Sequence, residues 1–204
     1  MRLIRLSFVA CSLAAVLGAC GAGRPASVAH ARSAAPPARA KSAEASAFAW
    51  LRPGPVPPGW RVAHLSDSAL LVYPGSWRRV HADAGTASAA QVDPHSGLIA
   101  GYLNATPQQG GETLGDWPGF RPAHNADEGD RDVRVLAAAR GLAFRDGTGS
   151  CVVDRYRTSR SAYQEIACLV RGARSTDVVV AAALAARWAR SAPALERAVS
   201  AFVA

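Results

Sequence analysis

Two cysteines, Cys151 and Cys168, are the residues of this 204-residue chain whose type and spacing most directly suggest chemistry. They bracket the segment CVVDRYRTSRSAYQEIAC. Two thiols at this spacing fit part of a metal site, a redox pair or a structural disulfide. A lone pair cannot supply the four ligands of structural zinc, and the segment lacks the Cys-x-x-Cys motif of redox enzymes. The choice depends on the compartment in which the chain folds.

The sequence lacks the motifs of the common catalytic sites. It contains no Gly-x-Ser-x-Gly elbow, no P-loop, no Rossmann glycine pattern and no His-Glu-x-x-His helix. The only lysine, Lys41, lies far before any candidate domain, which excludes a Ser-x-x-Lys site there. The histidines of the domain show no ligand spacing; they are His64, His81, His95 and His124. We therefore predict no catalytic residue, no metal ligand and no cofactor.

One acidic cluster, HNADEGDRD at residues 124–132, could gather oxygen ligands around Gly129. A hard cation such as Ca²⁺ needs six to eight oxygens, and a tight turn can collect them. The spacing does not match the EF-hand loop, and Arg131 would oppose a cation. We expect a solvated loop and keep calcium as an alternative.

The first twenty residues resemble a bacterial lipoprotein signal. Two arginines precede an uncharged apolar run over residues 6–19, which is too short to span a bilayer as a helix. The run ends in Leu-Gly-Ala-Cys, which is similar to the lipobox. In that family the thiol of the cysteine, here Cys20, receives a diacylglycerol and the peptide is cut before it. The resemblance implies a signal peptide over residues 1–19 and an extracytoplasmic chain anchored to the cell membrane by lipid at Cys20.

The net charge of +8 is concentrated near the expected anchor. Residues 21–52 carry a net charge of +4, and basic residues there would attract anionic lipid headgroups. Residues 53–204 carry only +2, with no basic stripe interleaved with aromatics. We therefore exclude nucleic acid as a partner.

Composition divides the remaining chain into a tether and a domain. Residues 20–56 are rich in Ala, Pro and Arg and hold few large apolar side chains, which is typical of a flexible spacer. The segment LRPGPVPPG favours extended backbone at its end. Residues 57–204 are long enough for a single globular domain with its own core.

Short β-rich runs separated by turn-forming residues predict mostly strands in that domain. Strands with a few helices and no strict βαβ alternation indicate the fold class α+β. We expect a short helix over residues 112–120, cut by Pro118, and a C-terminal helix over residues 191–203, capped by Ser191. The expected strands cover residues 60–65, 69–73, 86–92, 97–104, 132–144 at least at its start, 151–158 and 162–170. Residues 177–186 are expected to form a buried strand or a strand that runs into a helix.

The two cysteine-bearing strands predict their own register. A tight turn at Ser159 and Arg160 brings together positions whose numbers add to 319. Facing cysteines at one end of a hairpin meet the distance limits of a disulfide, and the compartment implied by the lipobox is oxidising. We predict a structural disulfide between Cys151 and Cys168. The other facing pairs are Tyr156 with Tyr163 and Asp154 with Glu165.

Residues 57–204 also resemble the PsbP-like α-β-α sandwich. The resemblance rests on the order of LVYPGSW, GYLNATP, DWPGF, the cysteine hairpin, VVVAAA, Trp188 and a C-terminal amphipathic helix ending in Phe202. The family includes a photosystem II extrinsic subunit, a yeast nuclear-transport factor and actinobacterial LpqN-type lipoproteins. It implies a central antiparallel sheet flanked by helices and no catalytic residues. It also implies a partner-binding groove flanked by Asn104, Trp117 and Phe120.

These observations predict a non-catalytic, membrane-anchored lipoprotein of the cell envelope that binds a protein or glycolipid partner. The alternative is an envelope hydrolase, or a small-ligand or calcium binder, with an unrecognised site.

The anchor can be tested by replacing Cys20 with alanine. Because the thiol accepts the lipid, Cys20→Ala should remove palmitate labelling and either release the chain from the membrane fraction or leave it as the longer precursor. Unchanged membrane partitioning of a processed Cys20→Ala chain would contradict the prediction.

Overall fold

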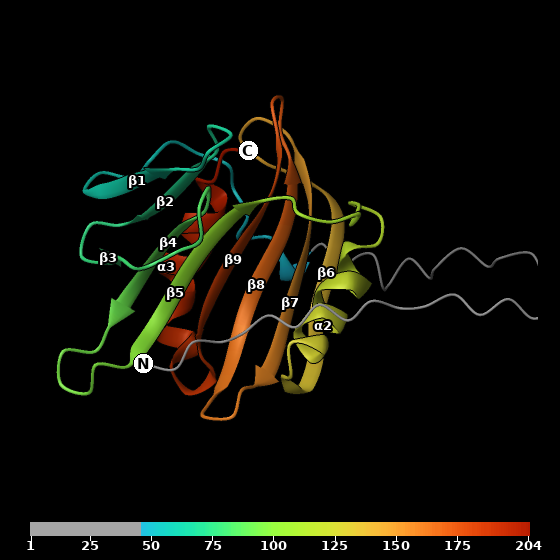
Figure 1. Cartoon of the computed structure of the whole chain (residues 1–204). Helices are drawn as coiled ribbons and strands as arrows, with labels where there is room; N and C mark the ends of the chain where they lie inside the picture. Colours follow the sequence, from blue (N-terminus) through green and yellow to red (C-terminus); the bar gives the residue numbers. More distant parts are fainter. Residues whose placement is uncertain (1–45) are drawn as a thin grey trace, which may run out of the picture. The chain divides into compact units, whose positions relative to one another are not determined.

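The structure is a computed structural model that describes residues 46–204. Its main feature is a seven-stranded sheet with the order β3-β4-β5-β9-β8-β7-β6, in which every neighbouring pair is antiparallel (Figure 1). The strands are β3 Arg78–Arg79, β4 Ala87–Val92, β5 Ile99–Pro107, β6 Arg131–Ala143, β7 Thr148–Arg157, β8 Ala162–Arg171 and β9 Thr176–Leu184.

The sheet is buried on both faces along its centre. In β9, Val179 and Ala181 belong to one hydrophobic cluster, whereas Val178 and Val180 belong to another. Successive side chains of a strand point to opposite faces, so the two clusters lie on opposite sides of the sheet. This arrangement explains why β9 is apolar at nearly every position rather than at alternate ones.

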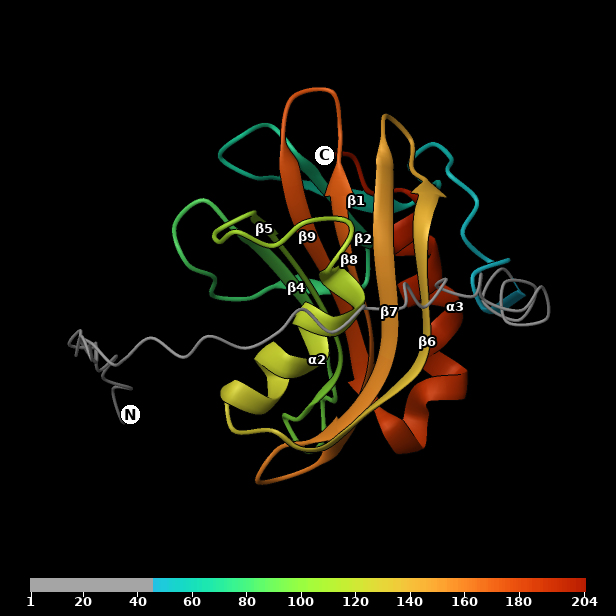
Figure 2. The same cartoon turned by 90° about the vertical axis from the view of Figure 1, so that its right-hand side faces the viewer.

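The first face is covered by helix α3, Trp188–Ser200, and by the hairpin of β1, Trp60–His64, with β2, Leu70–Pro74. Leu195 and Val199 of α3 and Phe202 beyond it pack in the same cluster as Leu71 of β2. The second face is covered in part by helix α2, Trp117–Asp127. Figures 1 and 2 show α2 and α3 on opposite sides of the strands. The fold class is α+β, as predicted.

Both helices differ in position from the sequence prediction. Pro118 does not cut α2 but lies in its first turn, where the missing N–H has no intrahelical partner to lose. The helix therefore continues to Asp127. Helix α3 begins at Trp188, directly after the 3₁₀ turn Ala185–Arg187, so Ser191 lies inside the helix and does not cap it.

The packed part of the chain begins before residue 57, where the sequence placed its boundary. Phe48 is 4% exposed and belongs to the first core. The backbone N–H groups of Arg52 and Gly54 donate to the side chain and carbonyl of Ser200, respectively. The predicted signal peptide, Cys20 and most of the tether lie outside the described residues. Within residues 46–204, no helix is long and apolar enough to cross a membrane.

The β7–β8 hairpin has the predicted register. Tyr156 pairs with Tyr163 and Asp154 with Glu165. Cys151 pairs with Cys168, and their sulfur atoms are bonded on the α3 side of the sheet, where neither residue is exposed.

Mass spectrometry of the non-reduced protein should find these two cysteines linked and closed to alkylation. The bridge joins residues 17 apart in the sequence. Reduction should therefore lower the free energy of unfolding by about 2–4 kcal/mol, measured by denaturant titration. A Cys151→Ala, Cys168→Ala chain separates this effect from other actions of the reductant, because its stability should not respond to reductant. Free thiols in the untreated protein would contradict the prediction.

Candidate binding groove

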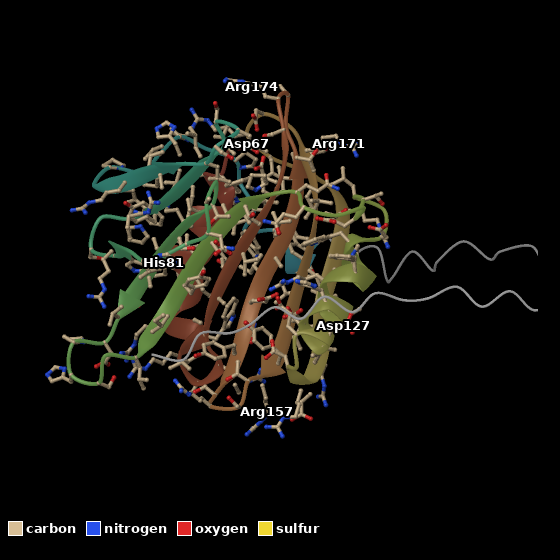
Figure 3. All side chains as sticks on the ribbon, viewed as in Figure 1. Asp67, His81, Asp127, Arg157, Arg171 and Arg174 are labelled. Atoms are coloured by element: carbon tan, nitrogen blue, oxygen red, sulfur yellow. A yellow bond between two sulfur atoms is a disulfide. The ribbon has the colours of Figure 1, made fainter. Side chains whose placement is uncertain are left out.

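Helix α2 covers only one side of the second face and leaves a groove beside it. The helix packs over β6, β7 and β8, so the same face of β4, β5 and β9 carries no helix among the described residues (Figure 1). The groove between α2 and these strands has a volume of about 640 Å³. His81, after β3, lies at its rim away from α2 (Figure 3).

The floor of the groove combines polar and apolar side chains. Alternate residues of β5 face it, namely Tyr102, Asn104 and Thr106. Ser88 of β4 donates a hydrogen bond to Asn104 Oδ1 at 2.8 Å, and its Oγ lies 3.1 Å from the hydroxyl of Tyr102. Strand β9 adds the apolar positions Val178, Val180 and Ala182.

The wall of the groove is a stack of rings on α2. The ring centroids of Trp117 and Phe120 are 5.8 Å apart, as are those of Phe120 and His124. Spacings of three and four residues place these side chains on one helix face. Trp117 is buried, and its indole N–H donates to the carbonyl of Ala167 at 3.0 Å. Phe120 remains 39% exposed, so the wall presents an aromatic surface to the groove.

A buried ion pair attaches α2 to the sheet. The Nε and Nη2 atoms of Arg121 donate to the two carboxylate oxygens of Glu165 at 2.7 and 3.1 Å. Glu165 has no exposed surface. The charge of Glu165 raises the pKa of Arg121 against the opposing effect of burial. The two-point geometry fixes the rotation of the guanidinium as well as its distance.

A second carboxyl, Asp154, is buried beside this pair and forms no ion pair of its own with any of residues 46–204. Asn125 Nδ2 lies 3.3 Å from both Asp154 Oδ2 and Glu165 Oε1. Burial, followed by the charge of Glu165, raises the pKa of Asp154 to about 7. Burial and the same carboxylate also raise the pKa of Tyr156. The cluster therefore holds two carboxyl groups against one guanidinium, and Asp154 is the one that accepts a proton.

The structure brings together the three residues predicted to flank a groove. Asn104 lies in the floor, and Trp117 and Phe120 form the wall. Of the four histidines, His81 and His124 line the groove, whereas those in β1 and in the β4–β5 turn do not.

The acidic cluster at residues 124–132 is not the solvated loop that the sequence predicted, because its first four residues belong to α2. Asn125 points to the sheet, whereas Asp127 is exposed on the outer side of the helix (Figure 3). Helical geometry therefore separates the side chains that a calcium ion would need together. Across residues 46–204, no group of three or more acidic, histidine or cysteine side chains could hold a metal ion.

The buried cluster of Arg121, Asp154 and Glu165 was not predicted from the sequence to be part of a site. A signal was present, because Asp154 and Glu165 are two carboxyl groups that the predicted hairpin register places opposite each other. Their partner could not be found by the same argument, since Arg121 lies 44 residues before Glu165 on a helix placed wrongly.

Comparison with solved structures finds proteins with a similar fold at low sequence identity. The chain is similar to cyanobacterial PsbP (CyanoP) from Synechocystis sp. PCC 6803, with a TM-score of 0.50 and 15% identity over 73% of this chain and 95% of that one. LpqN of Mycobacterium tuberculosis, described as involved in cell envelope biogenesis, aligns with a TM-score of 0.45 and 14% identity over 71% and 89%. No family model matches the sequence, and no curated protein does. The likeness to CyanoP supports the predicted PsbP-like fold.

The buried cluster predicts how stability depends on pH. The pKa of Asp154 is about 7 in the folded state and near 3.8 when exposed, so the folded chain binds a proton more tightly. The contribution of Asp154 to the free energy of unfolding is largest below about pH 4. It decreases by up to about 4 kcal/mol as the pH rises to about 7. Asp154→Asn should remove that loss and make the protein more stable than wild type at pH 8, measured by urea titration.

Asp177, whose pKa burial also raises to about 7, acts in the same direction at the far end of the sheet. Asp177→Asn is therefore the matched control, and the double variant should lose both parts of the pH dependence. An Asp154→Asn chain with the pH profile of wild type would show that Asp154 is not the group responsible.

Proposed function

We propose that this chain is a membrane-anchored lipoprotein of the cell envelope whose folded domain binds a protein or glycolipid partner in the groove beside α2. The observation that carries the proposal is the groove itself, where a stack of rings with the exposed Phe120 at its centre faces a floor of hydroxyl and amide groups. Such combinations are typical of binding sites, because the rings supply contact area and the polar groups orient the ligand.

The groove offers binding contacts rather than a catalytic arrangement. Two of its hydroxyl groups, on Ser88 and Tyr102, are hydrogen-bonded to each other, and that of Ser88 also donates to Asn104. Neither hydroxyl is hydrogen-bonded to a histidine or a carboxylate in the described part of the chain, as a nucleophile and its base would be. This arrangement favours a binding protein over the alternative of an envelope hydrolase.

The location in the envelope is supported by the beginning of the sequence. The lipobox-like Leu-Gly-Ala-Cys at residues 17–20 would place the mature chain on the outer side of a membrane. Residues 21–45 then have the composition of a spacer between the lipid and the domain. A domain held in this way can contact partners in the membrane or beyond it.

Phe120 is the side chain expected to contribute most to partner binding. It is central to the ring stack and 39% exposed, and large aromatic residues carry much of the binding energy at interfaces. The experiment is to replace Phe120 with a photoreactive phenylalanine derivative in the full chain and to irradiate the cells that make it. A specific crosslinked product should form, and its mass distinguishes a protein from a glycolipid.

Leu136 provides the matched control. It is a large apolar residue on β6 with 47% exposure, and it does not line the groove. The photoreactive residue at this position should give no specific product. Equal products from both positions, or none from position 120, would overturn the proposal. Asn104→Ala should weaken crosslinking at position 120, because it removes the polar centre of the floor.

A further inference from the structure

The loop between β5 and α2 contributes Glu112 to the groove lining, with one carboxylate oxygen that has no hydrogen-bond partner among the described residues. Glu112 lines the groove and is 7% exposed. Its Oε2 atom is buried and receives no hydrogen bond from any residue of the described chain. A buried carboxylate oxygen without a donor carries a desolvation cost that nothing offsets. A ligand that donates to this oxygen would remove the cost.

The loop around Glu112 is held in place by hydrogen bonds. Gln108 Nε2 donates to the backbone carbonyls of Glu112 and Gly110, and the Gln108 backbone N–H donates to Thr176 of β9. On the other side, the Thr113 N–H donates to Asp116 Oδ1 at 2.6 Å. The carboxylate is therefore presented by a fixed backbone on both sides, which lowers the entropy cost of binding.

Gly110 makes room for this carboxylate. A Cβ atom at this position would lie 2.5 Å from Glu112 Oε2, which is closer than two such atoms can approach. A side chain at residue 110 would thus push the carboxylate away from its present place.

The groove as a whole is acidic, although the chain carries a net charge of +8. Arg121 is the only arginine or lysine among the residues that line it, and its charge is taken by Glu165. Asp83 and Glu128 add two more carboxylates at the rim. A cationic ligand would therefore be attracted by the groove, and an anionic one repelled. The rings of the wall also favour a cation, because their faces are negative.

The floor favours an extended ligand with side chains. Tyr102, Asn104 and Thr106 follow one another at two-residue intervals along β5, about 7 Å apart. The strand is hydrogen-bonded to β4 and β9 on its two sides, so it has no free edge for a ligand's backbone. An extended polypeptide repeats its side chains at the same interval, and side-chain contacts are what the floor can offer.

From these observations we propose that the groove binds an extended segment of a protein partner and that Glu112 holds a lysine or arginine side chain of that segment. This inference rests on the proposed function and selects a basic protein over a glycolipid as the partner.

The test compares two synthetic peptides, acetyl-Ala-Thr-Ala-Arg-Ala-amide and the same peptide with neutral citrulline in place of arginine. Each is titrated into the ¹⁵N-labelled full chain and followed by NMR. A charge-assisted contact predicts that the arginine peptide binds about 10- to 100-fold more tightly. Its largest shifts should lie at residues 110–113 and along β5. The preference should weaken with added salt.

Three variants identify the contact. Glu112→Gln should bind the two peptides equally, and Gly110→Ala should reduce the preference because it displaces the carboxylate without removing it. Asp127→Asn removes the same charge from the outer side of α2 and should keep the full preference. A peptide-free spectrum of each variant that matches the wild-type spectrum establishes that the variant is folded.

Equal binding of the two peptides by the wild type, no binding of either, or an equal loss in Glu112→Gln and Asp127→Asn would overturn the inference. If crosslinking at position 120 is unchanged in Glu112→Gln, the groove binds a partner but not through Glu112. The proposed function is then retained, and the inference about Glu112 is wrong. If neutralising the arginines and lysine of residues 24–41 changes the groove spectra without peptide, the occupant is the chain's own segment and the partner assignment is wrong.

Discussion

The contact between Arg121 and Glu165 is the interaction on which the groove depends. Helix α2 has only two buried residues, Trp117 and Asn125, so it lacks the apolar stripe by which most surface helices are held. It is attached instead by one indole ring and by a guanidinium that reaches a fully buried carboxylate. Loss of either charge would leave the other buried and unpaired, at a cost of about 3–5 kcal/mol. Polar geometry, more than apolar packing, therefore sets where the wall of the groove stands.

That geometry depends in turn on the register of one hairpin. Cys151 and Cys168 face the α3 side of the sheet, and three residues further along the same strands Asp154 and Glu165 face the α2 side. A slip of one residue would move each side chain to the other face. The disulfide joins one cross-strand pair, and in doing so it preserves the alignment of the carboxyl pair that receives Arg121. The two faces of the domain are thus linked through the register of β7 and β8.

Much of this fold follows from local sequence. Runs of β-forming residues between turn-forming residues predicted most of the strands, and the turn at residues 159–160 predicted the hairpin register. The helices were predicted less accurately. Pro118 was taken to end a helix, whereas it lies in the first turn of α2. Phe48 was missed as a core residue because it follows a long segment rich in alanine, proline and arginine, which was taken as a tether, whereas the cluster it joins is formed by residues of the later chain.

The site was predictable only in part. Asn104, Trp117 and Phe120 were expected in one groove from a family resemblance rather than from their spacing. The contacts that shape the groove join residues far apart in sequence, such as Arg121 and Glu165, and no periodic pattern reports them. Glu112 could not be identified either. What distinguishes it is a buried carboxylate oxygen that has no hydrogen-bond donor among the described residues, and the burial of that oxygen depends on how the loop folds.

The strand order has a consequence for how the groove comes into existence. Strands β6 to β9 follow one another as a meander, whereas β5 pairs with β9 across at least 70 residues of chain. Closing so long a loop is entropically expensive, and such pairings tend to slow folding. The floor of the groove is divided between β5 and β9, so a chain in which only the meander has formed has a disulfide hairpin and a helix but nothing for a partner to bind. The complete groove is therefore present only in chains in which β5 has paired with β9.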